Sequence, residues 1–330
     1  MKRCLLVLVL CAGCGTGSAP TARPSATASP GGPPRQVQAV IHTDHGPSEL
    51  LVGKAAMFVG AHRGGSLQRI DPATNRVTAT LPIGGQLELE ASTSLGGLPS
   101  VDESVTSLWA CSNTDGVLHQ VDPRTMRVTA TVPADCDGGL RTRVGSTLWA
   151  VPGQGTKPLL VIDVSTAKVV RRVPLGDAGP GWGPATSLAG QVVIGAAEST
   201  PVLRRDGTLL RRVPVSTPWL VATGGHLYRM PTDGALAELD PVTLAVRRTF
   251  AAPPHLQIDG DPRLVADGNG HLYYRPISTA VYRIDLDSGR VTPLLDLPYG
   301  EAITGMAWAF GSLWVSNFDN DTVWRIDPTA

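Results

Sequence analysis

Seven aspartates, each closing a short apolar stretch, recur along the chain. They are Asp71, Asp122, Asp163, Asp206, Asp240, Asp285 and Asp327, with gaps of 51, 41, 43, 34, 45 and 42 residues. An aromatic residue stands 12 to 14 positions before six of them, namely Phe58, Trp109, Trp149, Tyr228, Tyr273 and Trp314, and Val193 takes this place in the remaining repeat. Two landmarks in near-constant register indicate that the chain consists of seven copies of one unit.

Each copy reads as a set of short strands. In the last copy, residues 302–307, 312–316 and 322–328 are rich in β-branched and aromatic residues and are bounded by Gly, Asn, Asp or Pro, which are strand and turn signals. A repeat of about forty residues with four strands is typical of a β-propeller blade. The sequence therefore predicts an all-β, seven-bladed β-propeller with four-stranded blades. We name the strands of a blade A to D from the axis outward.

The seventh copy lacks a fourth strand at its own end. Residues 36–42 match the strand D pattern of residues 76–82, so that Val37, Ala39 and Ile41 fall on the positions of Val77, Ala79 and Leu81. We therefore expect the N-terminal strand to complete the last blade, which closes the ring and removes an exposed sheet edge.

The repeated aspartate is best interpreted as a turn residue. Asp71 and Asp122 are followed directly by Pro72 and Pro123. Proline presets the backbone of the second turn position, and the Asp carboxylate accepts backbone N–H groups. We expect seven turn caps here, rather than metal ligands or catalytic acids.

The first 14 residues do not belong to the propeller. Lys2 and Arg3 precede an apolar run over residues 5–10, and Cys14 follows, a pattern typical of a targeting signal. It resembles a bacterial lipoprotein signal, and the resemblance implies that Cys14 is lipidated and becomes the new N-terminus. The family prefers Leu three residues before that cysteine, where this chain has Cys11. An ordinary secretory signal or a short anchor is the alternative.

Residues 15–34 are Ser, Thr, Ala, Pro and Gly with a single Arg, a composition typical of a flexible tether with a reach of about 25 Å. The expected organisation is thus a signal (1–14), a tether (15–34) and a propeller (35–330). We expect an extracytoplasmic monomer held at the cell membrane by its lipid anchor. The chain has 28 basic and 28 acidic residues, and without a basic block it lacks a nucleic-acid footprint.

Two cysteines remain outside the signal, Cys111 and Cys136. An extracytoplasmic compartment permits a disulfide between them. In the expected blade one strand lies between the two residues, which separates them by roughly 10 Å unless the loop curls back. The sequence leaves open whether they are bridged.

Function in a propeller is expected on the variable D–A and B–C loops. The longest insertion carries four carboxylates, Glu88, Glu90, Asp102 and Glu103. They form either a site for a cation or a basic partner, or a solvated acidic loop.

Further candidates for this face lie near other junctions. His255, Asp259 and Asp261 form either an acid/base or metal site, or a set of turn residues. Trp182, flanked by glycines, packs over the axis or is an exposed recognition residue. Trp219 and Tyr299, with Glu301 beside it, fall at comparable loop-to-strand junctions.

The chain contains no catalytic or nucleotide-binding motif of the common kinds. We therefore assign no catalytic residue, no metal and no cofactor from the sequence.

The segment Gly311-Ser-Leu-Trp-Val-Ser-Asn317, followed by Val-Trp-Arg-Ile-Asp-Pro at 323–328, resembles the bacterial YVTN and NHL-like propeller repeats. The resemblance covers residues 36–330 and implies the fold, because such repeats serve many functions. A related group, the streptogramin B lyases, carries Trp-Phe-Thr-Glu on strand B. Here Asn317, Ser112 and Pro152 occupy the Glu position, so no catalytic residue is transferred from that group.

Three hypotheses about function follow. The first is a non-enzymatic binding scaffold for a protein or small ligand, acting through the D–A and B–C face. The second is a lyase or hydrolase with an acid/base site over the axis, formed by His255 with Asp259 or Asp261. The third is a structural component of the cell envelope. Converging titratable groups around the axis favour catalysis, whereas an apolar patch favours binding.

Overall fold

The computed structural model describes residues 36–84, 87–89, 107–112, 116–134, 141–152, 157–176, 182–196, 198–217, 219–223, 225–230, 236–251, 263–277, 279–297 and 301–329. The chain divides into a unit Met1–Pro33 and a unit Pro34–Ala330. The predicted signal, the tether and Cys14 lie outside the described residues. No helix among the described residues is long and apolar enough to cross a membrane.

The described strands form seven antiparallel sheets of four strands each. Blade 1 consists of β2 (Pro47–Val52), β3 (Met57–Ala61), β4 (Ser66–Asp71) and β5 (Arg76–Pro82). Blade 2 consists of β6 (Leu87–Leu89), β7 (Leu108–Ser112), β8 (Val117–Asp122) and β9 (Arg127–Pro133). Blade 3 consists of β10 (Arg141–Val144), β11 (Thr147–Ala150), β12 (Leu159–Asp163) and β13 (Lys168–Val173). Blade 4 consists of β14 (Trp182–Leu188), β15 (Gln191–Ala196), β16 (Thr200–Arg204) and β17 (Leu209–Val213). Blade 5 consists of β18 (Trp219–Thr223), β19 (His226–Met230), β20 (Ala237–Leu239) and β21 (Val246–Thr249). Blade 6 consists of β22 (Arg263–Ala266), β23 (His271–Ile277), β24 (Ala280–Asp285) and β25 (Val291–Asp296). Blade 7 consists of β26 (Ile303–Ala309), β27 (Ser312–Asn317), β28 (Thr322–Ile326) and β1 (Val37–His42).

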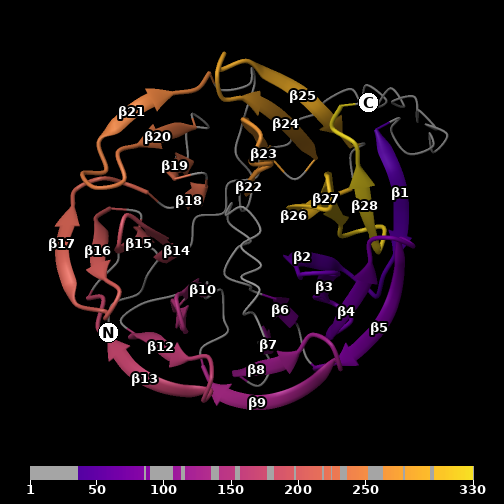
Figure 1. Cartoon of the computed structure of the whole chain (residues 1–330), viewed down its shortest axis with the longest axis horizontal. Helices are drawn as coiled ribbons and strands as arrows, with labels where there is room; N and C mark the ends of the chain where they lie inside the picture. Colours follow the sequence, from indigo (N-terminus) through magenta and orange to yellow (C-terminus); the bar gives the residue numbers. More distant parts are fainter. Residues whose placement is uncertain are drawn as a thin grey trace, which may run out of the picture. The chain divides into compact units, whose positions relative to one another are not determined.

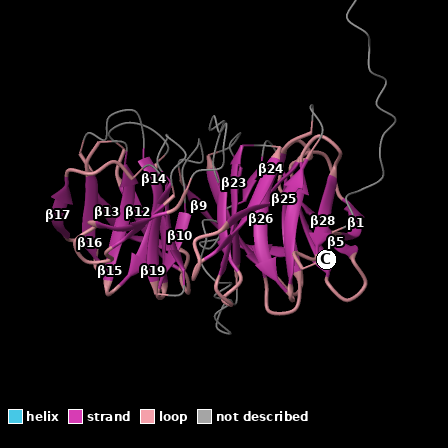
Figure 2. Ribbon diagram, turned by 90° about the horizontal axis from the view of Figure 1, so that it is seen from above, coloured by secondary structure: helices cyan, strands magenta, loops and turns pink. Residues whose placement is uncertain are grey.

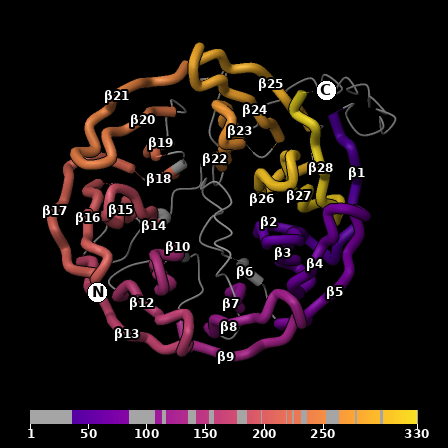
Figure 3. The backbone as a smooth tube through the Cα atoms, in the orientation of Figure 1, coloured from indigo at the N-terminus to yellow at the C-terminus, as the bar shows by residue number. Residues whose placement is uncertain are grey.

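The seven sheets are arranged as a ring (Figure 1). Strand A of each blade lies toward the centre and strand D at the rim, as the backbone trace also shows (Figure 3). The connections between strands gather at the two faces of the ring (Figure 2). The prediction of a seven-bladed propeller with four-stranded blades is confirmed.

The ring is closed by β1, which pairs antiparallel with β28 as the outermost strand of blade 7. Ile41 lies opposite Val323 and is only 2% exposed, whereas its neighbour Val40 is 39% exposed. The Asp327 N–H donates to the Gln36 carbonyl at 2.8 Å, extending the pairing by one bond. The predicted closure by the N-terminal strand is therefore confirmed.

The core consists of side chains packed between neighbouring blades. All seven landmark positions on strand B are buried, and so is the apolar residue four positions before each repeated aspartate: Leu67, Leu118, Leu159, Val202, Leu236, Val281 and Val323. A blade buries both of its faces against its neighbours, which explains why the apolar signal recurs on two strands in every copy.

The repeated aspartates cap the C–D turns, as expected. Asp163 is typical, since its Oδ1 accepts hydrogen bonds from the Ser165 and Thr166 N–H groups and from both of their hydroxyls, at 2.7–3.0 Å. These bonds favour the ionised carboxylate and hold the pKa of Asp163 below its usual value, the Ser165 hydroxyl contributing most. The pKa values of the other six repeated aspartates are lowered by hydrogen bonds in their own turns.

Neighbouring blades are also joined by a repeated polar contact near the C–D turns. A long side chain of one blade donates a hydrogen bond to a backbone carbonyl in the C–D turn of the next blade. The pairs are Arg69 with Arg124, Gln120 with Val164, Arg211 with Val242, Arg248 with Leu286, Arg283 with Pro328 and Arg325 with Pro72. These contacts satisfy backbone carbonyls at the turns and link neighbouring blades.

Candidate functional site

Inner strands of blades 6, 7 and 1 bring polar residues together near the axis, on the D–A and B–C face. A register shift in β2 lies between Pro47 and Leu50, and one in β26 lies between Ile303 and Met306. Such bulges re-aim side chains that a regular strand would place elsewhere. We call the residues Glu49, Arg263, Arg275, Glu301, Thr304 and Asn317 the axial polar cluster.

An ion pair forms the centre of the axial polar cluster. The Arg263 Nη2 lies 2.6 Å from the Glu49 Oε1, and the two side chains are only 8% and 14% exposed. The Arg263 Nε donates to the Thr304 carbonyl at 3.2 Å. The guanidinium of blade 6 therefore passes the inner strand of blade 7 and reaches blade 1.

A second arginine lies beside the first. Arg275 on β23 is directly opposite Arg263 in the strand register, is 4% exposed, and donates from Nη1 to the Ile303 carbonyl at 2.7 Å. Like charges opposite each other in a sheet destabilise it. The Glu49 carboxylate and the carbonyls of blade 7 supply the negative charge and dipoles that offset this repulsion.

Blade 7 adds a carboxylate and an amide. The Asn317 Nδ2 donates to the Glu301 Oε2 at 2.7 Å. Asn317 is fully buried at the end of strand B, and its Oδ1 accepts no hydrogen bond from any residue that the structure describes. The Ser112 Oγ, at the corresponding end of β7, likewise has no partner within the described part of the chain. Both residues stand at the last position of strand B in their blades.

The axial polar cluster stands on a tight seam between blades 7 and 1. The Ser316 Oγ accepts from the Gly305 N–H at 2.6 Å and donates to the Ser48 carbonyl at 2.9 Å. A Cβ atom at position 305 would lie 2.1 Å from the Ser48 carbonyl oxygen. Only glycine permits this approach of the two inner strands, so the seam fixes the distance between the two bulges.

The axial polar cluster contains guanidinium groups, carboxylates, a hydroxyl and an amide. Guanidinium groups and carboxylates bind complementary ions and amides, and carboxylates can also act as general acids or bases. No group of three or more His, Cys, Asp or Glu side chains suited to a metal ion occurs among the described residues.

Several residues expected on this face are placed by the structure. Glu88 lies within the inner strand β6, opposite Cys111, and not in a loop as we expected. The inserted sequence 90–106 joins β6 to β7, so it is an A–B connection and not a D–A loop. The alternation of Leu87 and Leu89 around Glu88 is a strand signal, too short to stand out in the sequence.

The tryptophans also begin strands. Trp182 is the first residue of β14, not a loop residue. Trp219 is the first residue of β18, half-buried and packed against the core between blades 5 and 6. Glu301 is the one predicted candidate that joins the axial polar cluster. The remaining candidates lie outside the described residues: Glu90, Asp102, Glu103, His255, Asp259, Asp261, Tyr299 and Cys136.

Sequence reasoning missed Glu49, Arg263 and Arg275. A signal was present, since Glu49 and Arg263 are charged residues directly before the apolar runs Leu50-Leu51-Val52 and Leu264-Val265-Ala266. A charge at the start of an otherwise apolar strand indicates a buried polar contact, but only the fold identifies its partner.

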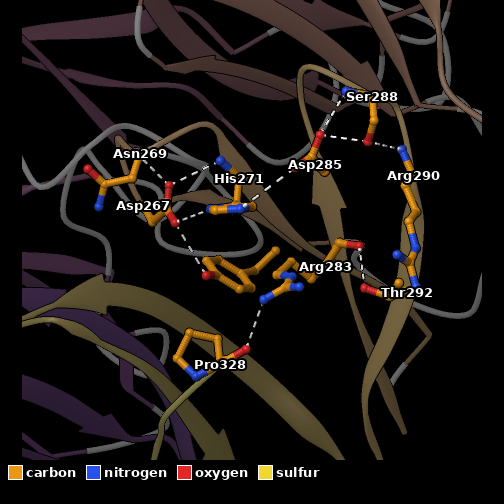
Figure 4. Close-up of polar contacts among 10 residues, drawn as sticks. Asp267, Asn269, His271, Arg283, Asp285, Ser288, Arg290, Thr292 and Pro328 are labelled. Carbon is orange, nitrogen blue, oxygen red and sulfur yellow. Dashed lines mark hydrogen bonds and ion pairs between the residues drawn. The ribbon is translucent and has the colours of Figure 1, made fainter. Parts of the chain in front are cut away.

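The opposite face carries a separate group of polar contacts in blade 6 (Figure 4). His271 begins strand B, and its Nδ1 lies 2.8 Å from the Asp267 Oδ2. The same carboxylate accepts from the Tyr273 hydroxyl at 3.4 Å and, through Oδ1, from the Asn269 N–H at 2.7 Å. These bonds order the A–B turn.

Burial raises the pKa of the Tyr273 hydroxyl, and the Asp267 charge adds to this effect. At the equivalent position of blade 5, burial raises the pKa of Tyr228 to about 12. Both hydroxyls therefore stay protonated at neutral pH, which makes neither of them a general base there.

The fold defines the chain as a seven-bladed β-propeller protein. No family model and no curated protein matches its sequence. Among solved structures it is similar to Raptor of Chaetomium thermophilum, with a TM-score of 0.69 and 13% identity over 88% of this chain; the match spans 29% of the Raptor chain.

Two enzymes are similar over nearly their whole length. Hydrazine synthase of Kuenenia stuttgartiensis has a TM-score of 0.66 and 16% identity, covering 89% of this chain and 99% of that one. Virginiamycin B lyase of Staphylococcus aureus has a TM-score of 0.69 and 12% identity, covering 87% of this chain and 97% of that one. At such identities the likeness shows the fold alone, and the three proteins differ in function.

Proposed function

We propose that the protein is a binding scaffold on the outer side of the cell membrane, held there by a lipid on Cys14. Its repeats are of the YVTN and NHL-like kind. The charged Lys2 and Arg3, the apolar run and the polar tether support the anchor. The partner is a protein or a small ligand, bound on the D–A and B–C face.

The observation that carries this proposal is the ion pair between Glu49 and Arg263, buried across three blades. Apolar residues of similar volume usually stabilise a core as well as a buried ion pair does, or better. The ring is already closed by β1 and by contacts at the C–D turns. A costly charged group at the axis is therefore better explained by recognition than by stability.

The ligand chemistry follows from the axial polar cluster. Arg263 and Arg275 favour carboxylate or amide oxygens, while Glu49 and Glu301 favour amino or amide N–H groups. A polar peptide segment, which offers both kinds of group within a few ångströms, satisfies this set.

The face is tested by site-specific photo-crosslinking in cells. A photoreactive residue at Asn320, exposed in the B–C hairpin of blade 7, is compared with one at Thr74, exposed in the C–D turn of blade 1. We expect a discrete adduct from position 320 that is reduced by Arg275→Lys. Equal adducts from both positions, or none from position 320, would contradict binding on this face.

The anchor is tested separately. Radiolabelled palmitate should enter the wild-type chain, and Cys14→Ser should abolish labelling and release the protein from the membrane fraction. Release without any loss of label, or membrane retention of the variant, would contradict a lipid anchor at Cys14.

A lyase function is a second candidate. It is favoured by titratable groups that converge near the axis, Glu49 and Glu301 with two arginines, and by the fold shared with virginiamycin B lyase. Loss of virginiamycin B on incubation with the protein, followed by mass spectrometry and abolished by Glu301→Gln, would support it. Unchanged antibiotic would leave the binding scaffold as the better account.

A further inference from the structure

A groove of about 450 Å³ lies on the face opposite to the axial polar cluster, between blades 1 and 2. It is bounded by the A–B turn of blade 1 (residues 52–56), by Arg69 of β4, and by Pro123 and Arg124 in the C–D turn of blade 2. Its volume is within the range of sites for small organic ligands, about 300–1,000 Å³. We call it the blade 1–2 groove.

The floor of the blade 1–2 groove is apolar. Phe58 and Leu108 are buried beneath it, and Val52 forms one side. A comparison with blade 7 explains the space. In the strand register Lys54 corresponds to Phe310, which packs edge-on against Trp314 at the core between blades 7 and 1. An aromatic ring thus fills in blade 7 the space that the flexible side chain of Lys54 leaves open in blade 1.

The rim of the blade 1–2 groove is cationic. Among the described residues that line it, Lys54, Arg69 and Arg124 are cationic and Asp71 is acidic. The Asp71 carboxylate already accepts from the Ala73 N–H and the Thr74 hydroxyl, each at 2.9 Å, so it is engaged in its own turn. The described lining therefore offers more cationic than acidic groups.

Two of the three nitrogen atoms of the Arg69 guanidinium are engaged in hydrogen bonds. Its Nε donates to the Thr78 hydroxyl at 3.1 Å and its Nη1 to the Arg124 carbonyl at 2.8 Å. The equivalent Arg325 in blade 7 engages all three nitrogens, with Ser312, Pro72 and Phe310. The Arg69 Nη2 makes no hydrogen bond to any described residue, because no carbonyl of the A–B turn approaches it.

Arg124 completes the pair of donors. Its backbone N–H and carbonyl are bonded, but its exposed guanidinium makes no hydrogen bond or ion pair with the part of the chain that the structure describes. A fixed guanidinium and an adaptable one thus stand side by side above an aromatic floor.

We propose that the blade 1–2 groove binds a small organic anion with a flat apolar body and one carboxylate. The body lies against Val52, Ala55 and Ala56, above the buried Phe58 and Leu108, and the carboxylate accepts hydrogen bonds from Arg69 and Arg124. Guanidinium and carboxylate groups match in geometry and charge, and an apolar body excludes water from the pair. This site is independent of the proposed partner face.

The test is isothermal titration of the full-length protein in mild detergent with 2-naphthoate, and with the neutral 2-naphthamide as the matched probe. We expect saturable binding of the acid, at least tenfold tighter than that of the amide. Arg124→Gln, which breaks no contact within the described chain, should weaken naphthoate binding about tenfold. Arg290→Gln, an exposed arginine in a C–D turn of blade 6, should leave it unchanged.

Two further kinds of result test whether the ligand binds in the blade 1–2 groove. Ala55→Trp fills the groove and should abolish binding without unfolding the protein, as circular dichroism will show. Equal affinity for acid and amide, unchanged binding by Arg124→Gln, or no saturable binding of naphthoate would each overturn the proposal.

Discussion

Arg263 and Glu49 lie 214 positions apart in the sequence, and their side chains meet at 2.6 Å near the axis. Arg263 begins the inner strand of blade 6, and Glu49 stands in the bulge of the inner strand of blade 1. Blade 7 lies between them, and its Thr304 carbonyl accepts a hydrogen bond from the Arg263 Nε. The first and the last third of the chain are thus joined electrostatically at the centre of the ring.

Removing one partner of this ion pair should destabilise the fold. Glu49→Ala leaves the Arg263 guanidinium buried without its counter-ion, and we expect the free energy of unfolding to fall by about 3–5 kcal/mol. The double variant Glu49→Ala with Arg263→Met should lose less than the sum of the two single variants. Chemical denaturation of all three variants measures this. Additive losses would show that the two side chains are not coupled.

Closure of the ring depends on inward side chains of β1. Ile41→Ala removes a buried side chain from the contact with β28 and should cost about 2–5 kcal/mol. Val40→Ala, one position along the same strand, changes an exposed residue and should cost no more than about 0.5 kcal/mol. Thermal denaturation of the two variants checks this. Similar losses for both would contradict the observed register.

The turn caps predict a loss of stability in acid. The folded-state pKa values of the seven repeated aspartates are lowered by hydrogen bonds in their turns. Such groups contribute stability above the unfolded-state pKa of about 3.9, and it is lost as the pH falls through the lower folded-state values. We expect the melting temperature to drop below about pH 4.

A single-site comparison isolates this effect. Asp163→Asn should lower the melting temperature at neutral pH and reduce the further drop in acid. Asp296→Asn, an exposed change at the end of a rim strand, should alter neither. An acid profile that is the same in Asp163→Asn and in the wild type would show that the caps do not control acid stability.

Cys111 is disulfide-bonded, and every other cysteine lies outside the described residues. We expect its partner to be Cys136, because Cys4, Cys11 and Cys14 belong to the predicted signal. A crosslink closing a loop of this size stabilises by roughly 3 kcal/mol. Peptide mapping without reduction should recover the two joined peptides, and Cys136→Ser should lower the melting temperature. A free Cys136 thiol in the mature protein would contradict the pairing.

The fold was predictable because its signals are local and repeated. Each copy contains three signals: a turn-capping aspartate, a buried aromatic residue, and an apolar residue four positions before the aspartate. Because the pattern occurs seven times, a single exception such as Val193 does not obscure it. The closing strand was found by the same pattern, displaced to the other end of the chain. Its residue Ile41 is buried against the neighbouring strand.

The candidate site was predictable only in part. Glu301 was singled out, but its partner Asn317 was noted for a different reason. Glu49 and Arg263 occur once each and pair across a third blade, so no repeat reveals them. The hydrogen bonds between neighbouring blades at the C–D turns were missed for another reason. Their acceptors, such as the Pro72 carbonyl that Arg325 binds, are backbone atoms, which the sequence does not distinguish from one another. Glu88 was misplaced because its strand has only three residues.

The pairing of β1 with β28 sets the order in which the molecule can be completed. During synthesis β1 leaves the ribosome before any other strand of the ring, and β28 leaves after all of them. The backbone N–H and C=O groups at the pairing edge of β1 therefore stay unpaired, and accessible to other chains, until the first six blades have been synthesised. The final closure is a step between distant segments, which is slow compared with hairpin formation. A chaperone acting on the emerging chain would have its greatest effect on this one strand.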